Sequence, residues 1–316
     1  MKIKILLMLS RFGLITLALF SLGTRPVVAD EPIYIVTTTS DLAYIASRVG
    51  GSRVRVDGLI RGNEDPHFIE PKPDFIMKMS RADMFVEIGM DLEVGWSPVL
   101  INQSRNSRIQ KNAPGYCNAS SGIRVLERPT TAVDRSMGDI HVYGNPHYWT
   151  DPVNASIIAR NIRDTLIRID SGGRSVYQAN YNAFFEAMRS LASSEARKFS
   201  AYRGLKVAVY HREFSYLANR FGFTIAGSIE EKPGVPPSAR YLKEIEERLK
   251  SQNVKIILIA PWNNPAYAGE VGRAIGASVI IMPVSVLSEP SIDTYEKAIS
   301  SMMERIRNAA DATRGR

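Results

Sequence analysis

Apolar runs rich in Val and Ile alternate along this chain with segments in which apolar residues recur every three or four positions. Runs of the first kind are typical of buried strands, and segments of the second kind are typical of amphipathic helices. Their alternation predicts βα units and mainly parallel sheets. The expected strands are 33–38, 54–60, 84–88, 123–126, 205–210, 254–260 and 279–282.

The segments between these strands are expected to be helices, and one of these helices is much longer than the others. It begins after Gly172-Gly173 and continues to about residue 200, with an apolar stripe formed by Tyr177, Tyr181, Phe184, Met188 and Leu191. At a rise of 1.5 Å per residue it would extend about 40 Å, enough to brace two lobes. The pattern therefore predicts an α/β protein of two lobes, 30–172 and 204–316, joined by a long linking helix within 173–203.

The first residues have the pattern of a secretory signal peptide. Lys2 and Lys4 provide a basic start, and residues 12–22 form a short apolar core. Val27-Val28-Ala29 is typical of the small residues before a signal-peptide cleavage site. We expect residues 1–29 to be removed on export to the periplasm, and no Cys follows the apolar stretch to carry a lipid. The alternative is an uncleaved membrane anchor, although the apolar core is short for a bilayer span.

The composition does not indicate a nucleic-acid-binding protein or a protein held together by disulfides. The chain has 40 Lys and Arg against 32 Asp and Glu, and the basic residues are scattered, so nucleic-acid binding is not indicated. Cys117 is the single cysteine, so no intrachain disulfide can form. We expect Cys117 to be buried, and the apolar core to hold the fold.

Histidines carry the candidate chemistry. The chain has four, and three of them, His67, His147 and His211, stand in distinctive phrases far apart in the sequence. Imidazole is mostly uncharged near neutral pH and is the commonest protein ligand for transition metals. His67 and His211 each follow an expected strand, where parallel α/β sheets gather their binding groups. We interpret the three histidines as one metal site assembled by the fold.

Acidic residues near these histidines are candidates to orient the rings. A metal-bound histidine usually donates its second ring N–H to a carboxylate or carbonyl. Asp65, Glu70 and Asp151 are placed to accept such bonds. For Asp151, which precedes Pro152 at an expected helix start, helix capping is an equally good interpretation.

The three phrases together resemble a known family. They read DPHxxEP at 65–71, NPHxWxDP at 145–152 and HxxFxYLxxRFG at 211–222, and this order resembles the cluster A-I metal-binding solute receptors of ABC transporters. The likeness covers essentially the whole chain after the signal peptide. It implies two α/β lobes bridged by a rigid helix, with the metal held in the cleft between them. It also implies a receptor, expected to be monomeric, that delivers its ion to a membrane permease with a cytoplasmic ATPase.

The resemblance carries the metal-binding role to His67, His147 and His211. Manganese-type members of the family tend to place a carboxylate three residues before the Phe of the third phrase, and here that position is His211. Zn²⁺ is therefore the expected transported ion, and Mn²⁺ is less favoured.

The chain departs from the family in its fourth ligand. The family usually adds an Asp after the last strand of the second lobe, but the matching residues 282–286 contain no carboxylate. Water could complete the coordination. The other candidates are His141, Glu213, Glu289 and Asp293. We interpret His141, which lies in the Pro- and Gly-containing stretch 129–144, as a loop residue.

Two other functions stay open at this point. Three histidines and a water can also form a catalytic zinc site, and Glu213 could act as the base of a zinc hydrolase, although no HExxH signature is present. An adhesin or a receptor for an organic ligand such as a chelated metal would use an aromatic cleft, to which Tyr148, Trp149 and Trp262 could contribute.

Overall fold

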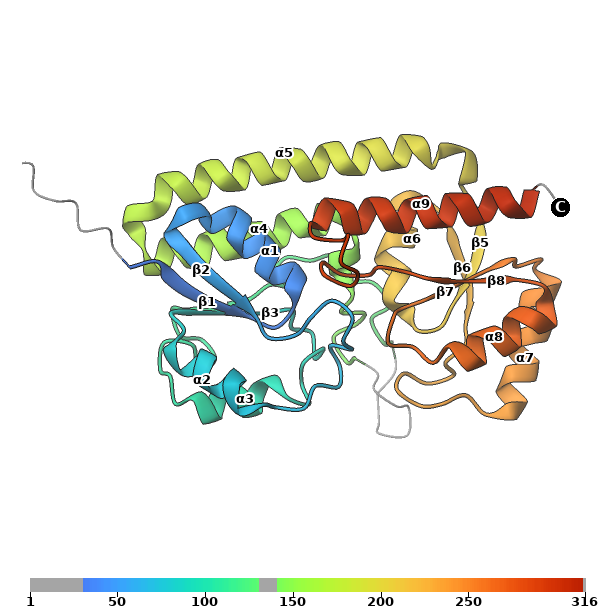
Figure 1. Ribbon diagram of the computed structural model, residues 1–316, viewed down its shortest axis with the longest axis horizontal. Helices are drawn as coiled ribbons and strands as arrows, with labels where there is room; N and C mark the ends of the chain where they lie inside the picture. Colours follow the sequence, from blue (N-terminus) through green and yellow to red (C-terminus); the bar gives the residue numbers. More distant parts are fainter. Residues whose placement is uncertain (1–30, 131–140, 315–316) are drawn as a thin grey trace, which may run out of the picture. The chain divides into compact units, whose positions relative to one another are not determined.

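A computed structural model describes residues 31–130 and 141–314 of the chain. Two four-stranded sheets, in which every pairing is parallel, form its two lobes (Figure 1). The first has the order β2-β1-β3-β4 and the second the order β6-β5-β7-β8. The strands are β1 (Ile33–Thr37), β2 (Val54–Gly58), β3 (Met84–Glu87), β4 (Tyr116–Asn118), β5 (Lys206–Val209), β6 (Thr224–Ser228), β7 (Ile256–Ile259) and β8 (Ser278–Ile281).

Helices pack around both sheets, and the longest passes along the two of them (Figure 1). This helix, α5 (Arg174–Lys198), has 25 residues and ends in a 3₁₀ turn at Ser200–Tyr202. The others are α1 (Ser40–Gly50), α2 (Pro73–Arg81), α3 (Ser97–Ser104), α4 (Pro152–Ile169), α6 (Ser215–Phe221), α7 (Ala239–Ser251), α8 (Pro265–Ile275) and α9 (Tyr295–Arg314).

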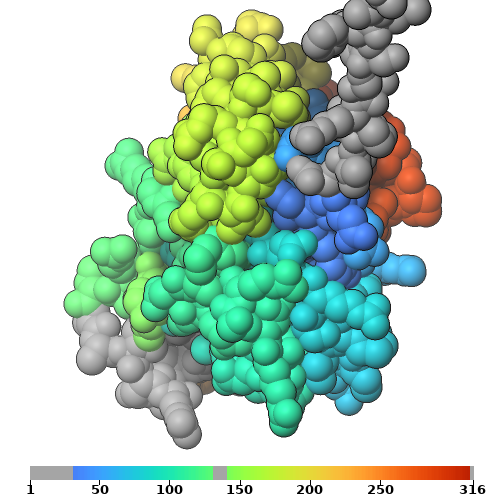
Figure 2. Space-filling model, turned by 90° about the vertical axis from the view of Figure 1, so that its left-hand side faces the viewer, coloured from blue at the N-terminus to red at the C-terminus, as the bar shows by residue number. Residues whose placement is uncertain are grey.

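One apolar core is continuous between the lobes. It contains β-strand residues from both sheets together with Tyr177, Phe184 and Met188 of the α5 stripe, all fully buried. Each such side chain contributes about 1.5–3 kcal/mol by leaving water, so α5 is bound to the helices beneath it along its length. In the end view of Figure 2 the yellow-green residues lie above blue residues of the first lobe, and α5 contacts α1.

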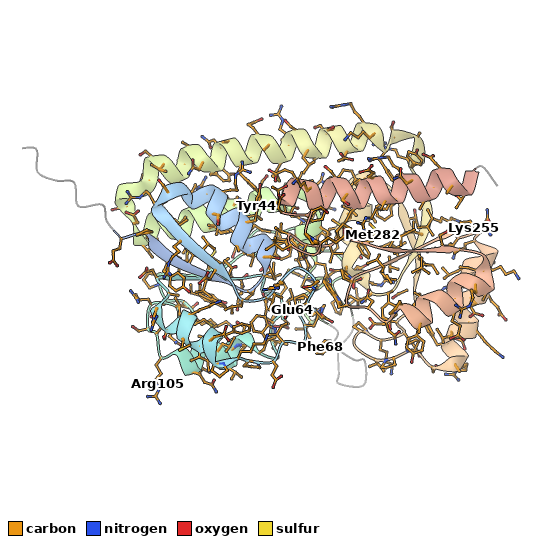
Figure 3. All side chains as sticks on the ribbon, in the orientation of Figure 1. Tyr44, Glu64, Phe68, Arg105, Lys255 and Met282 are labelled. Atoms are coloured by element: carbon orange, nitrogen blue, oxygen red, sulfur yellow. The ribbon has the colours of Figure 1, made fainter. Side chains whose placement is uncertain are left out.

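A polar contact adds to this core. Tyr44 of α1, labelled in Figure 3, donates a hydrogen bond of 2.7 Å to Glu296 of α9, which also pairs with Arg48. This contact joins a helix of the first lobe to the last helix of the chain. Residues from Pro32 onward form one compact unit, and the lobe boundaries at 172/173 and 203/204 stay a prediction.

The predicted α/β class and two parallel-sheet lobes are confirmed, but one predicted strand is wrong and two observed strands were not predicted. Residues 123–126 are not a strand, and the first sheet is instead completed by the three-residue β4. The backbone of Leu126 bonds to Tyr216 and Asn145, so tertiary partners replace the sheet. We did not predict β6, since its sequence TIAGS is short and contains a Gly where the register with β5 shifts.

Cys117 is buried, as predicted, and burial raises the pKa of its thiol to about 12. The predicted signal peptide, residues 1–29, lies outside the described residues. Within the described part of the chain, no helix combines the length and apolar character that crossing a bilayer requires.

A buried carboxylate in α1 generates a prediction about stability. Asp41 is 1% exposed, and it accepts the backbone N–H of Val286 at 3.0 Å from the loop after β8. Burial raises its pKa from 3.8 to about 7, although the bond from Val286 opposes the shift. Because folding raises this pKa, protonation of Asp41 stabilises the folded state. That stabilisation is complete below the unfolded pKa of 3.8 and is lost as the pH rises through about 7.

We therefore expect Asp41→Asn to stabilise the protein more at pH 8 than at pH 5. The difference in Tm between variant and parent should be larger at pH 8 by at least about 3 °C in thermal unfolding. Asp74→Asn, an exposed Asp in the first turn of α2, is the matched control and should show no such difference. An equal change in Tm at both pH values for Asp41→Asn would contradict the prediction.

Candidate metal centre

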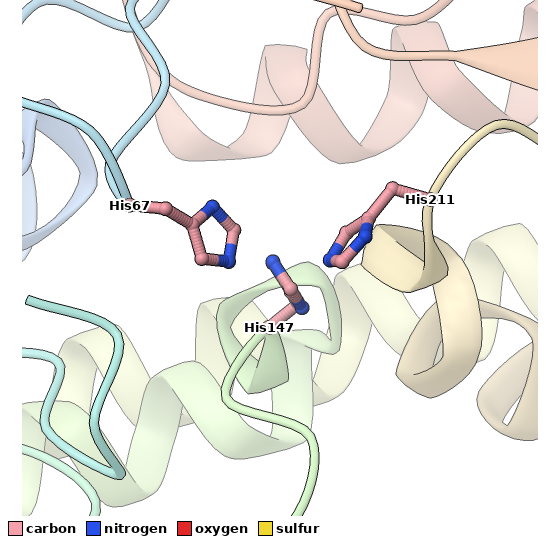
Figure 4. A group of neighbouring side chains, drawn as sticks. All are labelled: His67, His147 and His211. Carbon is pink, nitrogen blue, oxygen red and sulfur yellow. The ribbon is translucent and has the colours of Figure 1, made fainter. Parts of the chain in front are cut away.

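His67, His147 and His211 come together from three separate segments of the fold. One ring nitrogen from each lies within 4.8 Å of the corresponding nitrogens of the other two (Figure 4). The ring centroids are 5.1 Å apart for His67 and His147, 5.3 Å for His67 and His211, and 5.0 Å for His147 and His211. Two histidines bound through Nε2 to tetrahedral zinc, at about 2.0 Å each, have centroids about 5 Å apart. The centroids of the three rings therefore already have the spacing that tetrahedral zinc requires.

The first and second histidines are held by the same local device. Asp65 and Asn145 each precede a Pro-His pair, and their side-chain oxygens accept the backbone N–H of the histidine at 3.0 and 2.9 Å. The same oxygens lie 2.7 and 3.0 Å from Nδ1 of the ring. Proline restricts the intervening backbone, which favours this turn. An Asx-Pro-His sequence thus orients its own imidazole.

Hydrogen-bond chemistry settles which ring nitrogen of His147 carries the proton. The amide nitrogen of Asn145 donates to Glu127 and to the carbonyl of Arg212, both at 2.8 Å, so its oxygen must be the atom that faces the ring. An amide oxygen is only an acceptor, and Nδ1 of His147 must therefore be the donor. Nε2 is left with its lone pair directed toward the other histidines.

His211 follows β5 and is oriented by a different residue. Its Nδ1 lies 2.7 Å from Glu230, which follows β6. Burial by itself lowers the pKa of His211, but the nearby carboxylates of Glu213 and Glu230 raise it to about 9. The pKa of His147 lies well below its usual value because of burial and the neighbouring histidines. The free site therefore holds a proton on His211 while His147 stays neutral.

Contacts between the loops bring the second and third histidines together. Asn145 bonds to the carbonyl of Arg212, and Tyr216 of α6 donates to the carbonyl of Asn145 at 2.8 Å. Arg220 of α6 forms a two-pronged ion pair with Asp151, at 2.7 and 2.8 Å. On the other side, the indole N–H of Trp96 donates to the carbonyl of Pro66 at 2.9 Å and fixes the loop of His67.

Buried polar atoms that lack a hydrogen-bond partner gather at this site. In the described residues, seven buried side-chain N or O atoms have no such partner, and five of them belong to His67, His141, His147 and Glu213. Leaving such atoms unsatisfied in the interior costs free energy. Their concentration at one place indicates a ligand that would satisfy them together, and a cation satisfies nitrogen lone pairs and a carboxylate alike.

The cavity beside the histidines is small. It has a volume of about 30 Å³ and is lined by Asp65, His67, His211, Glu213 and Glu230 among others, with Phe68 (60% exposed and labelled in Figure 3) at its edge. Such a volume admits an ion or a water, whereas pockets for organic ligands measure about 300–1,000 Å³. A larger cavity of about 470 Å³ lies at the ends of β3 and β4, but none of the three histidines lines it.

Of the three acidic residues predicted to orient the rings, the structure places one against a histidine ring, one on the surface and one at a helix start. Asp65 lies 2.7 Å from Nδ1 of His67, and although burial opposes it, the hydrogen bond from His67 lowers the pKa of Asp65. Glu70 is exposed and does not line the small cavity. Asp151 accepts the N–H of Val153 at the start of α4, so the capping interpretation fits its position.

Of the candidate fourth ligands, two lie at the site and two do not. Glu289 pairs with Arg305 and Asp293 with Lys297, both at 2.7 Å, and neither lines the cavity. Glu213 is 1% exposed and lines the cavity, and burial raises the pKa of its carboxyl. His141 lies in a loop, as predicted, but its ring stacks on His67 with centroids 5.2 Å apart.

Sequence reasoning missed Asn145 and Glu230. The first had a signal, because Asn145-Pro146-His147 repeats the Asx-Pro-His pattern of Asp65-Pro66-His67. Glu230 follows β6, a strand that we did not predict. Its contact with His211, which follows the neighbouring strand β5, could therefore not be predicted.

Residues 35–309 match the family model described as ZnuA, zinc-uptake complex component A, periplasmic. The chain belongs to this family. The family is one of solute-binding receptors of ABC transporters and not of enzymes, as the sequence predicted.

Relatives of known name are similar in sequence, and a solved structure shares the fold. The chain is 25% identical over 289 residues to the zinc-binding lipoprotein AdcA of Streptococcus pneumoniae, covering 90% of this chain but 56% of AdcA, so it spans about half of that protein. It is 27% identical over 252 residues to the manganese ABC transporter substrate-binding lipoprotein PsaA of the same species, covering 78% and 77% of the two chains. A crystal structure of ZnuA has a TM-score of 0.75 at 24% identity, covering 88% of this chain and 99% of that one.

The relatives correct the predicted localisation. We expected a periplasmic protein freed by signal cleavage and carrying no lipid, but AdcA and PsaA are both lipoproteins. The names of these relatives therefore contradict the expected lipid-free form.

The residues that orient the rings generate a prediction. Asn145→Ala removes the oxygen that holds both the backbone and the ring of His147, and Glu230→Gln weakens the hold on His211. Each variant should bind zinc about 10–100-fold more weakly than the parent, as is usual when the partner of a metal-bound histidine is lost. Titration of the metal-free protein with zinc measures the effect.

Glu70→Gln serves as the control, because Glu70 is exposed and outside the cavity. Circular dichroism should show that all three variants are folded. Parent-like zinc affinity in Asn145→Ala and Glu230→Gln would show that the rings do not depend on these oxygens.

Proposed function

We propose that this protein is the zinc-binding receptor of an ABC transporter, which captures Zn²⁺ and delivers it to a membrane permease driven by a cytoplasmic ATPase. The observation that carries the proposal is the convergence of three imidazoles, one ring nitrogen of each lying within 4.8 Å of those of the other two. Two of them, His67 and His147, present a buried Nε2 with no hydrogen-bond partner. The family and the names of AdcA and PsaA add support for a metal as the ligand.

Donor chemistry favours zinc over manganese. The converging groups are nitrogens, and imidazole suits Zn²⁺ whereas Mn²⁺ prefers oxygen ligands. His211 occupies the position at which manganese-type members of the resembled family tend to carry a carboxylate. Each ring has an oxygen at Nδ1, from Asp65, Asn145 or Glu230, which makes the opposite nitrogen a better donor.

Two observations weigh against a hydrolase. The cavity of about 30 Å³ beside the histidines leaves no room for an organic substrate. Glu213, the candidate base, lines this same small cavity and has both oxygens buried without a hydrogen-bond partner. The same cavity size weighs against an organic ligand at this site. The monomeric state stays a prediction.

Replacing each ligand singly tests the proposal. His67→Ala, His147→Ala and His211→Ala should each weaken zinc binding at least about tenfold, because each removes one of few donors. Calorimetric titration of metal-free protein with zinc should give one ion per chain in the parent, and titration with manganese should show much weaker binding. Asp293→Ala, whose carboxylate pairs with Lys297, is the control and should match the parent.

Tighter manganese than zinc binding in the parent would overturn the choice of zinc. Zinc binding that survives unchanged in His211→Ala would show that the three histidines are not the site.

A further inference from the structure

His141 has the same bonding pattern as the three converging histidines. Its ring bonds to the backbone of Asp91, and its Nε2 is buried without a hydrogen-bond partner. The bond to Asp91 must therefore come from Nδ1. In all four histidines Nδ1 faces an oxygen, supplied by Asp65, Asn145, Glu230 or the carbonyl of Asp91. His141 thus has its Nε2 free for a ligand, as His67 and His147 do.

The backbone around His141 holds it beside the site. The carbonyl of His141 accepts the N–H of Gly144 at 3.0 Å, which closes a turn just before Asn145-Pro146-His147. Gly144 has φ of +101°, and a Cβ at that position would come within 2.3 Å of Val125 and 2.8 Å of the Leu126 carbonyl. Only glycine fits there without strain, so the chain is built to turn sharply between His141 and His147.

The ring of His141 lies beside those of His67 and His147, whereas no ring contact with His211 is present among the described residues. The centroid of the His141 ring is 5.2 Å from that of His67 and 6.2 Å from that of His147. Tetrahedral zinc requires about 5 Å between such centroids. The first distance already meets this requirement, and the second exceeds it by about 1 Å, a shift of the size that side chains commonly make on binding. His141 lies outside the group of nitrogens within 4.8 Å of one another, so it has to move inward.

We propose that His141 is the fourth ligand, so that the bound ion is held by four imidazoles. This inference rests on the proposed zinc receptor function and specifies its donor set. Residues 282–286 supply no carboxylate, and Glu289 and Asp293 are paired elsewhere. Glu213 then offsets the charge of the ion from a position beside His211 without binding it.

Zinc X-ray absorption distinguishes this arrangement from three histidines with water. The zinc-loaded parent should fit four imidazoles at about 2.0 Å, and His141→Ala should fit three imidazoles and one light atom. The variant should also bind zinc at least about tenfold more weakly in competition with a chelator, since it loses a direct ligand. Val142→Ala, which alters an exposed neighbour in the same turn, is the matched control and should behave as the parent.

Three results would overturn the inference. The first is a parent spectrum of three imidazoles and an oxygen, together with unchanged zinc affinity in His141→Ala; the receptor function would survive it. The second is loss of the fourth contact in Glu213→Gln but not in His141→Ala, which would assign the position to the carboxylate. The third is a parent that binds no zinc, which would remove the proposed function as well.

Discussion

The hydrogen bond from Nδ1 of each histidine to a neighbouring oxygen is the contact on which the site depends. An imidazole can rotate and can carry its proton on either nitrogen, so an unanchored ring would lose entropy on binding an ion. Asp65, Asn145 and Glu230 remove that freedom in advance. They fix Nδ1 as the bonded nitrogen and direct Nε2 inward, and they make the ring a stronger donor.

Anchoring the rings is useful only if their segments are held at the right separation, and here two kinds of contact cooperate. The continuous core under α5 joins the lobes. Nearer the site, Asn145 bonds to Arg212 and Asp151 pairs with Arg220, which joins the loop of His147 to that of His211. An Arg and a carboxylate that meet through two hydrogen bonds form a strong and directional pair. The second and third histidines therefore behave as one unit, and His67 approaches them from a loop that Trp96 secures.

The charge around the site complements a dication. Neutral imidazoles bring no negative charge, yet Asp65, Glu213 and Glu230 all line the same small cavity. Burial and its mutual repulsion with Glu230 raise the pKa of Glu213, so the metal-free site holds carboxylates in an unfavourable setting. A bound cation would relieve that cost, because opposite charges attract strongly where water is excluded. Nitrogen donors select the kind of ion, and the surrounding carboxylates favour its charge.

The sequence by itself determined most of the fold and singled out three candidate site residues. Periodicity located α4 and the buried stripe of α5, because burial on one face leaves a repeating pattern in the chain. His67, His147 and His211 were found because their type is scarce and its metal chemistry distinctive.

Only the tertiary structure decided which other residues meet them. Glu230 reaches His211 because β6 lies beside β5, and His141 reaches His67 because a turn at Gly144 brings it there. Glu289 and Asp293 had the right chemistry, but their partners on α9 hold them elsewhere. Contacts between residues distant in sequence depend on how the elements pack, and the local sequence pattern does not predict them.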